Sequence, residues 1–234
     1  MRILLAAILL LIAEFSYGQK SHFGSWNVIN TRITLAHRWE AFNEMQLRSQ
    51  SYYADHFYHE IKTGISYYVN KKFFCSYGRG KISYLLRSRK FYKPVTANET
   101  RLWQQLTMNN YLGNVKFEHR YRIEQRWFKT GYRNRFRYRL GASVPVDKSA
   151  AGKPYISAFN EVFLTNTEPH YERNRFFVGF GYKINSWVTL QPGYVYQYDF
   201  RDDEGNGKHF FQLTLNIDLD GDRNPWDKAS EEVD

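Results

Sequence analysis

The chain has 234 residues, of which 43% are hydrophobic and 18% aromatic, and its formal net charge is +10 at pH 7. This length predicts a single domain of ordinary size. The mean hydropathy of −0.63 excludes a bundle of transmembrane helices. It does not exclude a membrane β-barrel, because only alternate residues of each barrel strand meet lipid.

Residues 1–18 have the pattern of a secretory signal peptide. Arg2 supplies the positive start, residues 3–13 form an apolar core, and residues 16–18 have small residues at a cleavage site. The apolar core is well short of the ~20 residues that a membrane-spanning helix needs. We therefore expect export, cleavage near Gly18 and a mature chain that begins at Gln19, which is not a cysteine that could carry a lipid anchor.

The basic charge alone would suit a nucleic-acid-binding protein. Export argues against that reading, as does the every-second-residue spacing of the arginines, so no nucleic-acid partner is expected. Cys75 is the single cysteine, which excludes an internal disulfide and a zinc site built from several cysteines.

From residue 21 onward, apolar and polar residues alternate with a period of two, which predicts β-strands. The expected strands cover residues 21–35, 39–52, 57–69, 73–86, 98–111, 115–127, 132–142, 155–164, 173–183, 188–200 and 209–219. Their lengths suit strands that cross a membrane at a tilt. Because bacterial single-chain barrels normally have an even number of strands, we expect ten to twelve.

The clearest alternation lies in residues 115–142, which predict a hairpin around a Lys-Thr-Gly turn. One face is mainly apolar and aromatic, for example Phe117, Ile123 and Phe136, and the other is almost wholly charged. A soluble sheet would bury the apolar face, whereas a membrane barrel turns it toward lipid and keeps a polar lumen.

The loops and the aromatic residues favour the membrane barrel. Short turns near residues 37, 70, 113 and 185 broadly alternate with longer or more polar loops near 54, 92, 169 and 204, and Tyr and Trp recur toward strand ends. The predicted fold is therefore all-β, an antiparallel transmembrane β-barrel of residues 19–220 followed by a polar tail, 221–234. A soluble periplasmic lipocalin-like binding protein is the alternative.

Several segments resemble the domain of unknown function 2490 family. They are residues 23–27, 46–49, 98–103, 117–122, 160–164 and 173–177, so the resemblance extends over nearly the whole mature chain. It implies an exported bacterial outer-membrane β-barrel from a Bacteroidetes-type lineage. The family has no established activity, so the resemblance implies no catalytic residues.

The strongest functional candidate is a charge network in the lumen. Its members are Lys116, Glu118, Arg120, Arg122, Glu124, Arg126, Arg133, Arg135, Arg137, Arg139, Arg101, Glu99, Glu161, Arg173 and Arg175. Arginine pairs bidentately with carboxylate, so the network could simply fill a narrow lumen. Its excess of arginine could instead form an anion site or passage. The expected partners are outer-membrane lipid or lipopolysaccharide and small anions, and the expected state is a monomer.

No catalytic constellation, metal site or cofactor motif is recognised. A barrel enzyme acting on outer-membrane lipid would need Ser, His and an orienting residue, but His59, His119 and His209 fall on the apolar face without an evident serine partner. Residues 218–222 resemble the start of a calcium loop, yet the twelfth position is Ala229 instead of Glu. The basic loop at residues 87–90 could meet lipid A phosphates.

Overall fold

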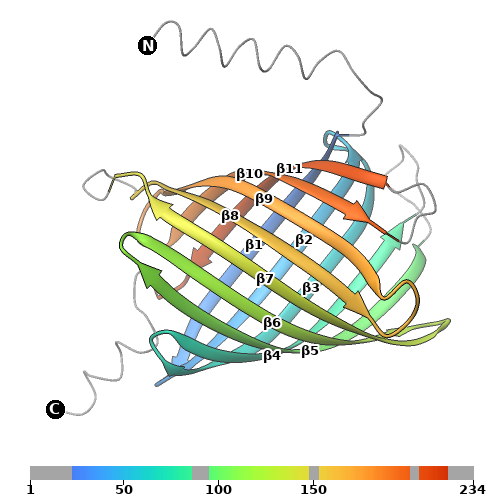
Figure 1. Ribbon diagram of the computed structural model, residues 1–234, viewed down its shortest axis with the longest axis horizontal. Helices are drawn as coiled ribbons and strands as arrows, with labels where there is room; N and C mark the ends of the chain where they lie inside the picture. Colours follow the sequence, from blue (N-terminus) through green and yellow to red (C-terminus); the bar gives the residue numbers. More distant parts are fainter. Residues whose placement is uncertain (1–22, 86–94, 148–152, 201–205, 221–234) are drawn as a thin grey trace, which may run out of the picture.

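In the computed structural model, residues 23–85, 95–147, 153–200 and 206–220 are described, and they form a closed barrel of eleven strands (Figure 1). The strands are β1 (Phe23–Ala36), β2 (Trp39–Ser51), β3 (Ala54–Asn70), β4 (Phe73–Leu85), β5 (Val95–Leu112), β6 (Val115–Phe128), β7 (Gly131–Pro145), β8 (Tyr155–Thr165), β9 (Tyr171–Lys183), β10 (Val188–Asp199) and β11 (Asn206–Asp218). This confirms the expectation of ten to twelve. The predicted signal peptide, 1–18, and the predicted tail, 221–234, lie outside the described residues.

Consecutive strands pair antiparallel all the way round, and β1 closes the barrel by pairing in parallel with β11. This seam runs from Phe23 opposite His209 to Arg32 opposite Asp218. The side chains of Arg32 and Asp218 reinforce it, with Nε to Oδ1 at 2.7 Å. An odd strand number sets the start of β1 and the finish of β11 at opposite ends (Figure 1), which we call the N-terminal end and the C-terminal end of the barrel.

The predicted central hairpin is β6 and β7. Its register places Ile123 opposite Phe136 and Glu124 opposite Arg135. Gly131 has φ +133°, a conformation that glycine adopts without steric cost, and this explains the glycine at the end of the turn.

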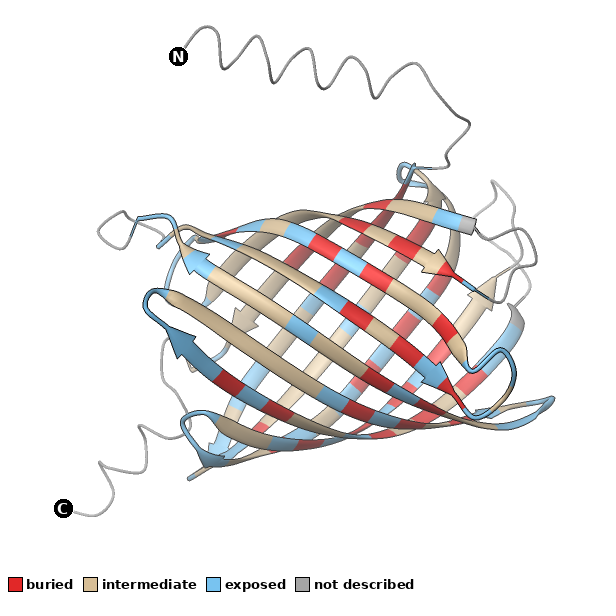
Figure 2. Ribbon diagram, in the orientation of Figure 1, coloured by how far each residue is buried: buried red, intermediate tan, exposed pale blue. Residues whose placement is uncertain are grey.

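Buried and exposed positions alternate along the strands (Figure 2), and the buried positions of the hairpin are charged ones. Ile123 is 48% exposed and Phe136 39%, whereas Glu124 is fully buried and Arg137 is 6% exposed. Apolar residues outside and charges inside are the arrangement of a membrane barrel, the reverse of a soluble lipocalin.

Strand β4 departs from this pattern. Ile82 is fully buried in the lumen, while Arg79 and Lys81 are exposed on the outside. The reason lies on the neighbouring strand: Trp103 fills the lumen beside β4, and a Cβ on Gly78 would lie 2.3 Å from its ring. A side chain at position 78 would clash with this ring, so a glycine stands there on the inward face of β4.

The exposed cations belong to a polar patch across the middle of the outer surface. This β4–β5 polar patch consists of Arg79, Lys81 and Ser83 on β4 with Asn98 and Gln104 on β5, and it borders Gln125 on β6. Ser83 Oγ donates to Asn98 at 3.0 Å, and Gln125 Nε2 donates to Gln104 at 3.0 Å. Arg79 and Lys81 form no ion pair within the described part of the chain.

Three expected loop boundaries were wrong. Residues 54–56, 95–97 and 206–208 were assigned to loops but lie in β3, β5 and β11. The connection before β3 is a two-residue turn, and a register shift after Arg48 inserts Phe57 as an extra residue that packs against a lumenal apolar cluster. Such a bulge turns a side chain to the other face of the sheet.

The alternation of short and long connections is only partial. The nine-residue connection 146–154 lies at the C-terminal end, together with the turns at 37–38, 71–72 and 113–114.

Among the described residues, no helix is long and apolar enough to cross a bilayer.

Candidate functional site

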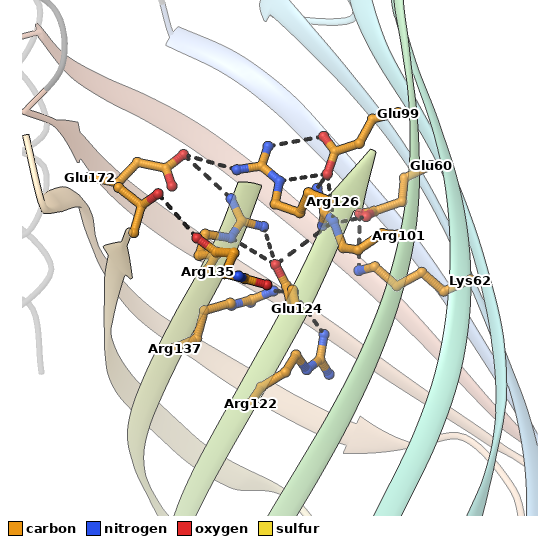
Figure 3. Close-up of polar contacts among 12 residues, drawn as sticks. Glu60, Lys62, Glu99, Arg101, Arg122, Glu124, Arg126, Arg135, Arg137 and Glu172 are labelled. Atoms are coloured by element: carbon orange, nitrogen blue, oxygen red, sulfur yellow. Dashed lines mark hydrogen bonds and ion pairs between the residues drawn. The ribbon is translucent and has the colours of Figure 1, made fainter. Parts of the chain in front are cut away.

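The inward faces of β3, β5, β6, β7 and β9 bring their charges together in the lumen (Figure 3), and β2 and β8 add Glu44 and Glu161. Glu124 on β6 lies at the centre. Its carboxylate is 2.5 Å from Arg135 Nη2 and 2.7 Å from Arg137 Nη1, and Arg122 and Arg101 are 3.7 and 3.8 Å away. One fully buried carboxylate therefore neutralises parts of four guanidinium groups.

Glu161 on β8 is a second centre of the same kind. Its Oε1 accepts from Arg120 at 2.6 Å and from Arg137 at 2.7 Å, and its Oε2 accepts from Arg175 at 3.3 Å. Arg137 thus joins the two centres, and the network continues from β6 to β9.

On the other side of Glu124 the network crosses β5 to β2. Glu99 accepts from Arg101 and Arg126, both at 2.6 Å. Glu60 on β3 is 3.2 Å from Arg101 and 3.0 Å from Lys62, which also reaches Glu44 on β2 at 2.6 Å. Glu172, at the start of β9, is 3.5 Å from both Arg126 and Arg135.

The strand register places arginines directly opposite one another, so their glutamate partners lie at offset positions. Arg122 lies directly opposite Arg137, and Arg120 opposite Arg139, although like charges in opposite positions repel. The guanidinium groups instead reach along or across the lumen to glutamates at offset positions, as Arg120 does to Glu161.

The remaining predicted members lie at the edges of this network. Arg139 pairs with Glu118, and Arg173 pairs with Asp199. Lys116 lines the lumen near the C-terminal end. Arg133 lies over the ring of Phe128 at 5.7 Å, beside the β6–β7 turn and outside the central network.

The predicted charge network did not include the aromatic residues of the lumen, although Trp103 shares the parity of Glu99 and Arg101. Trp26, Trp103 and Phe163 are almost fully buried, and arginines stack on them: Arg122 lies 4.1 Å from Trp103, and Arg137 4.6 Å from Phe163. The sequence could have predicted that Trp26 points into the lumen. Ile29 and Ile33, apolar residues of the kind that face lipid, have the opposite parity on β1.

The lumen is therefore two-sided. Its wall over β9, β10, β11 and β1 carries an apolar cluster of Trp26, Val28, Phe177, Val195 and Phe210, whereas β2 to β8 carry most of the charges.

Two cavities remain, one at each end of the barrel. The cavity at the N-terminal end has a volume of about 460 Å³, and the one at the C-terminal end about 680 Å³. Both are lined by Gln46, Lys62, Arg137 and Arg175. These four side chains therefore lie where the two cavities adjoin in the middle of the lumen.

The other candidates do not gather into a site. His119 and His209 face outward and share hydrogen bonds with Tyr138 and Tyr194 at 2.9 and 2.6 Å, and His59 is exposed. Asp218 belongs to the seam, while residues 221–222 and the basic loop 87–90 lie outside the described residues. Within the described ranges no group of three or more His, Cys, Asp or Glu residues could hold a metal ion.

A closed barrel with an apolar outside and a charged lumen defines the chain as an outer-membrane-type β-barrel. The model of the family described as "Protein of unknown function (DUF2490)" matches residues 23–208, and the chain belongs to this family. No curated protein matches it in sequence.

Solved structures of similar fold include outer-membrane-expressed OmpT of Vibrio cholerae, with 10% identity and a TM-score of 0.39 over 69% of this chain. Another is an anion-selective porin from Comamonas acidovorans, with 12% identity and a TM-score of 0.38 over 76% of this chain. The match covers 55% of either protein, so the chain spans about half their length.

Proposed function

We propose that this protein is a monomeric barrel of the bacterial outer membrane whose narrow lumen binds small anions and does not conduct freely. The observation that carries the proposal is the charge imbalance of the lumen. In the ion pairs of the described residues, thirteen cations share nine carboxylates. A surplus of positive charge among these groups favours an anion as the missing partner.

The membrane location is supported by the outer surface. Apart from the β4–β5 polar patch, outward positions near the middle of the strands are mainly apolar, such as Ile29, Met45 and Val178. The export signal predicted at residues 1–18 fits the same location, and the lipid or lipopolysaccharide of that membrane would then contact the barrel. The proposal assigns no catalytic activity.

Closure is supported by the network between the two cavities. Eleven strands enclose more space than the eight-stranded barrels that side chains fill, and less than the water-filled porins. Long arginine and glutamate side chains meet across that space, for example Arg120 on β6 with Glu161 on β8. Free ions would have to break these pairs to pass.

Planar-bilayer recording of the purified protein tests this proposal. We expect no current or a very small one with weak anion preference. Because Arg137 lines both cavities, the double change Arg135→Ala and Arg137→Ala should open a measurable conductance. Arg79→Ala, outside the barrel, is the control and should leave the trace unchanged. A large cation-selective current in the unmodified protein would refute both closure and anion binding.

A further inference from the structure

Arg48 and Arg175 are the arginines of the N-terminal cavity whose charge is least neutralised. Arg48 Nη2 donates to Gln46 at 2.6 Å but lies 3.9 Å from Glu60, its nearest carboxylate. Arg175 reaches Glu161 at 3.3 Å, whereas Arg135 and Arg137 approach carboxylates to 2.5 and 2.7 Å. The Nε atoms of both Arg48 and Arg175 are buried and have no hydrogen-bond partner.

Both guanidinium groups are held in place by an aromatic ring. The Cζ atom of Arg48 lies 3.4 Å from the centre of the Trp26 ring, and that of Arg175 lies 4.5 Å from it. Trp26 is fixed in turn by its Nε1 donating to Gln46 at 3.0 Å. Arg48 and Arg175 therefore share one ring, and protein carboxylates neutralise their charges only weakly. Because the ring holds both guanidinium groups in place, they are pre-organised to bind an external anion.

A third arginine stands at the same cavity. Arg173 pairs with Asp199 through its Nε atom, and within the described residues its two Nη groups have no hydrogen-bond partner. Arg48, Arg173 and Arg175 all line the cavity, so one oxyanion could accept hydrogen bonds from several of their N–H groups.

The wall beside these arginines is apolar. Phe57 and Phe210 line the same cavity and belong to the apolar cluster around Trp26, where the rings of Trp26 and Phe210 meet edge to face at 5.8 Å. Phe57 reaches the lumen only because of the bulge after Arg48. A purely inorganic anion would leave this surface unused.

We propose that the N-terminal cavity binds a small amphipathic organic anion, with a single carboxylate or phosphate on Arg48, Arg173 and Arg175 and a short apolar body against Phe57 and Phe210. The volume of about 460 Å³ falls within the range of sites for small organic molecules. This inference rests on the proposed anion-binding function and names its site and ligand class.

Calorimetric titration of the full barrel in lipid nanodiscs tests it, with hexanoate as the probe and hexyl phosphate as the alternative headgroup. Acetate and inorganic phosphate lack the apolar body of the predicted ligand, and hexanol lacks its negative charge. We expect the two hexyl anions to bind at least about tenfold more tightly than any of these three, since each of the three lacks either the charge or the buried apolar surface. Whichever of hexanoate and hexyl phosphate binds more tightly identifies the preferred headgroup as carboxylate or phosphate.

Arg48→Gln and Arg175→Gln should each weaken hexanoate binding about tenfold or more, as expected for loss of a charge-assisted hydrogen bond. Arg79→Gln removes the same charge from the outside of the barrel and should bind like the unmodified protein. Heat-modifiable migration on gels shows whether each variant is folded, and the comparison of probes on the unmodified protein does not depend on any variant.

The outcomes separate this inference from the function it rests on. If inorganic phosphate or acetate binds as well as hexanoate, or if Arg48→Gln and Arg175→Gln bind hexanoate normally, the inference is overturned while anion binding stands. If no anion binds at all, both fail. A large anion-selective current together with arginine-dependent hexanoate binding would overturn the closed lumen and leave the site intact.

Discussion

At the scale of single residues, Glu124 is the side chain on which most of the lumen depends. It is fully buried, and Arg135 and Arg137 donate to it directly. Glu124→Gln removes the carboxylate that these two guanidinium groups share, and removing one partner of a buried ion pair costs about 3–5 kcal/mol. We expect a loss of that size in the free energy of unfolding, measured by denaturant titration of the barrel in lipid vesicles.

Glu118→Gln is the matched control for this change. The Glu118 side chain is 28% exposed and, among the described residues, forms an ion pair only with Arg139, so the same substitution should cost about 1 kcal/mol or less. Equal losses at the two positions would mean that the central network adds nothing beyond an exposed ion pair.

At the scale of the strand, the outward faces of β4 and β6 predict opposite changes in stability: adding a charge on β6 should destabilise the barrel, and removing one on β4 should stabilise it. Ile123 lies near the middle of β6 and faces outward. Ile123→Arg should lower the free energy of unfolding in lipid by about 2–4 kcal/mol, the cost of a charge at the bilayer midplane. Arg79 is six residues from either end of β4, too far for its side chain to reach the headgroups easily, so Arg79→Leu should raise stability by a similar amount.

Vesicles of pure lipid are the right medium for both measurements, because no other protein can cover the β4–β5 polar patch there. Arg122→Ile, on the lumen side of β6, should be milder than Ile123→Arg for insertion. If Arg79→Leu destabilises the barrel, the patch does not face lipid. If Arg122→Ile disrupts assembly more than Ile123→Arg does, the two faces of β6 are reversed.

These strands also show how far the sequence predicts the fold. The hairpin of β6 and β7 could be predicted with both faces, because eleven or more residues of strict alternation leave one register. The faces of β4 could not, since the decisive fact is the ring of Trp103 on the next strand, which fills the space beside Gly78. Phe57 was misplaced for a similar reason: a bulge depends on the neighbouring strand.

At the scale of the whole molecule, the candidate site was predicted only in part. Alternation identified the arginines of the hairpin as one wall of the lumen, and Glu124 and Glu161 as their partners on that wall. It could not show that Arg48 and Arg175, on β2 and β9, lie over the same Trp26 ring. That contact crosses the seam, which joins the first and last strands, and no local pattern encodes the closure.

The seam leads to the last prediction, which concerns the topology of the barrel in its membrane. With eleven strands and a parallel β1–β11 pair, the chain must enter β1 on one side of the membrane and leave β11 on the other. The β6–β7 turn at Lys129 lies at the end where β1 begins, and the β5–β6 turn at Asn114 lies at the opposite end. A barrel with an even number of strands would instead have both chain ends on one side.

Single cysteines at positions 129 and 114, in a Cys75→Ser background, can be labelled on intact cells with a membrane-impermeant maleimide. We expect one of the two to react and the other to be protected. An epitope tag just before Phe23 should lie on the same side of the membrane as position 129 and be equally accessible. A tag just after Asp218 should lie on the same side as position 114. Tags that appear on the same side would mean an even strand number, and the parallel seam with its Arg32–Asp218 pair would have to be abandoned.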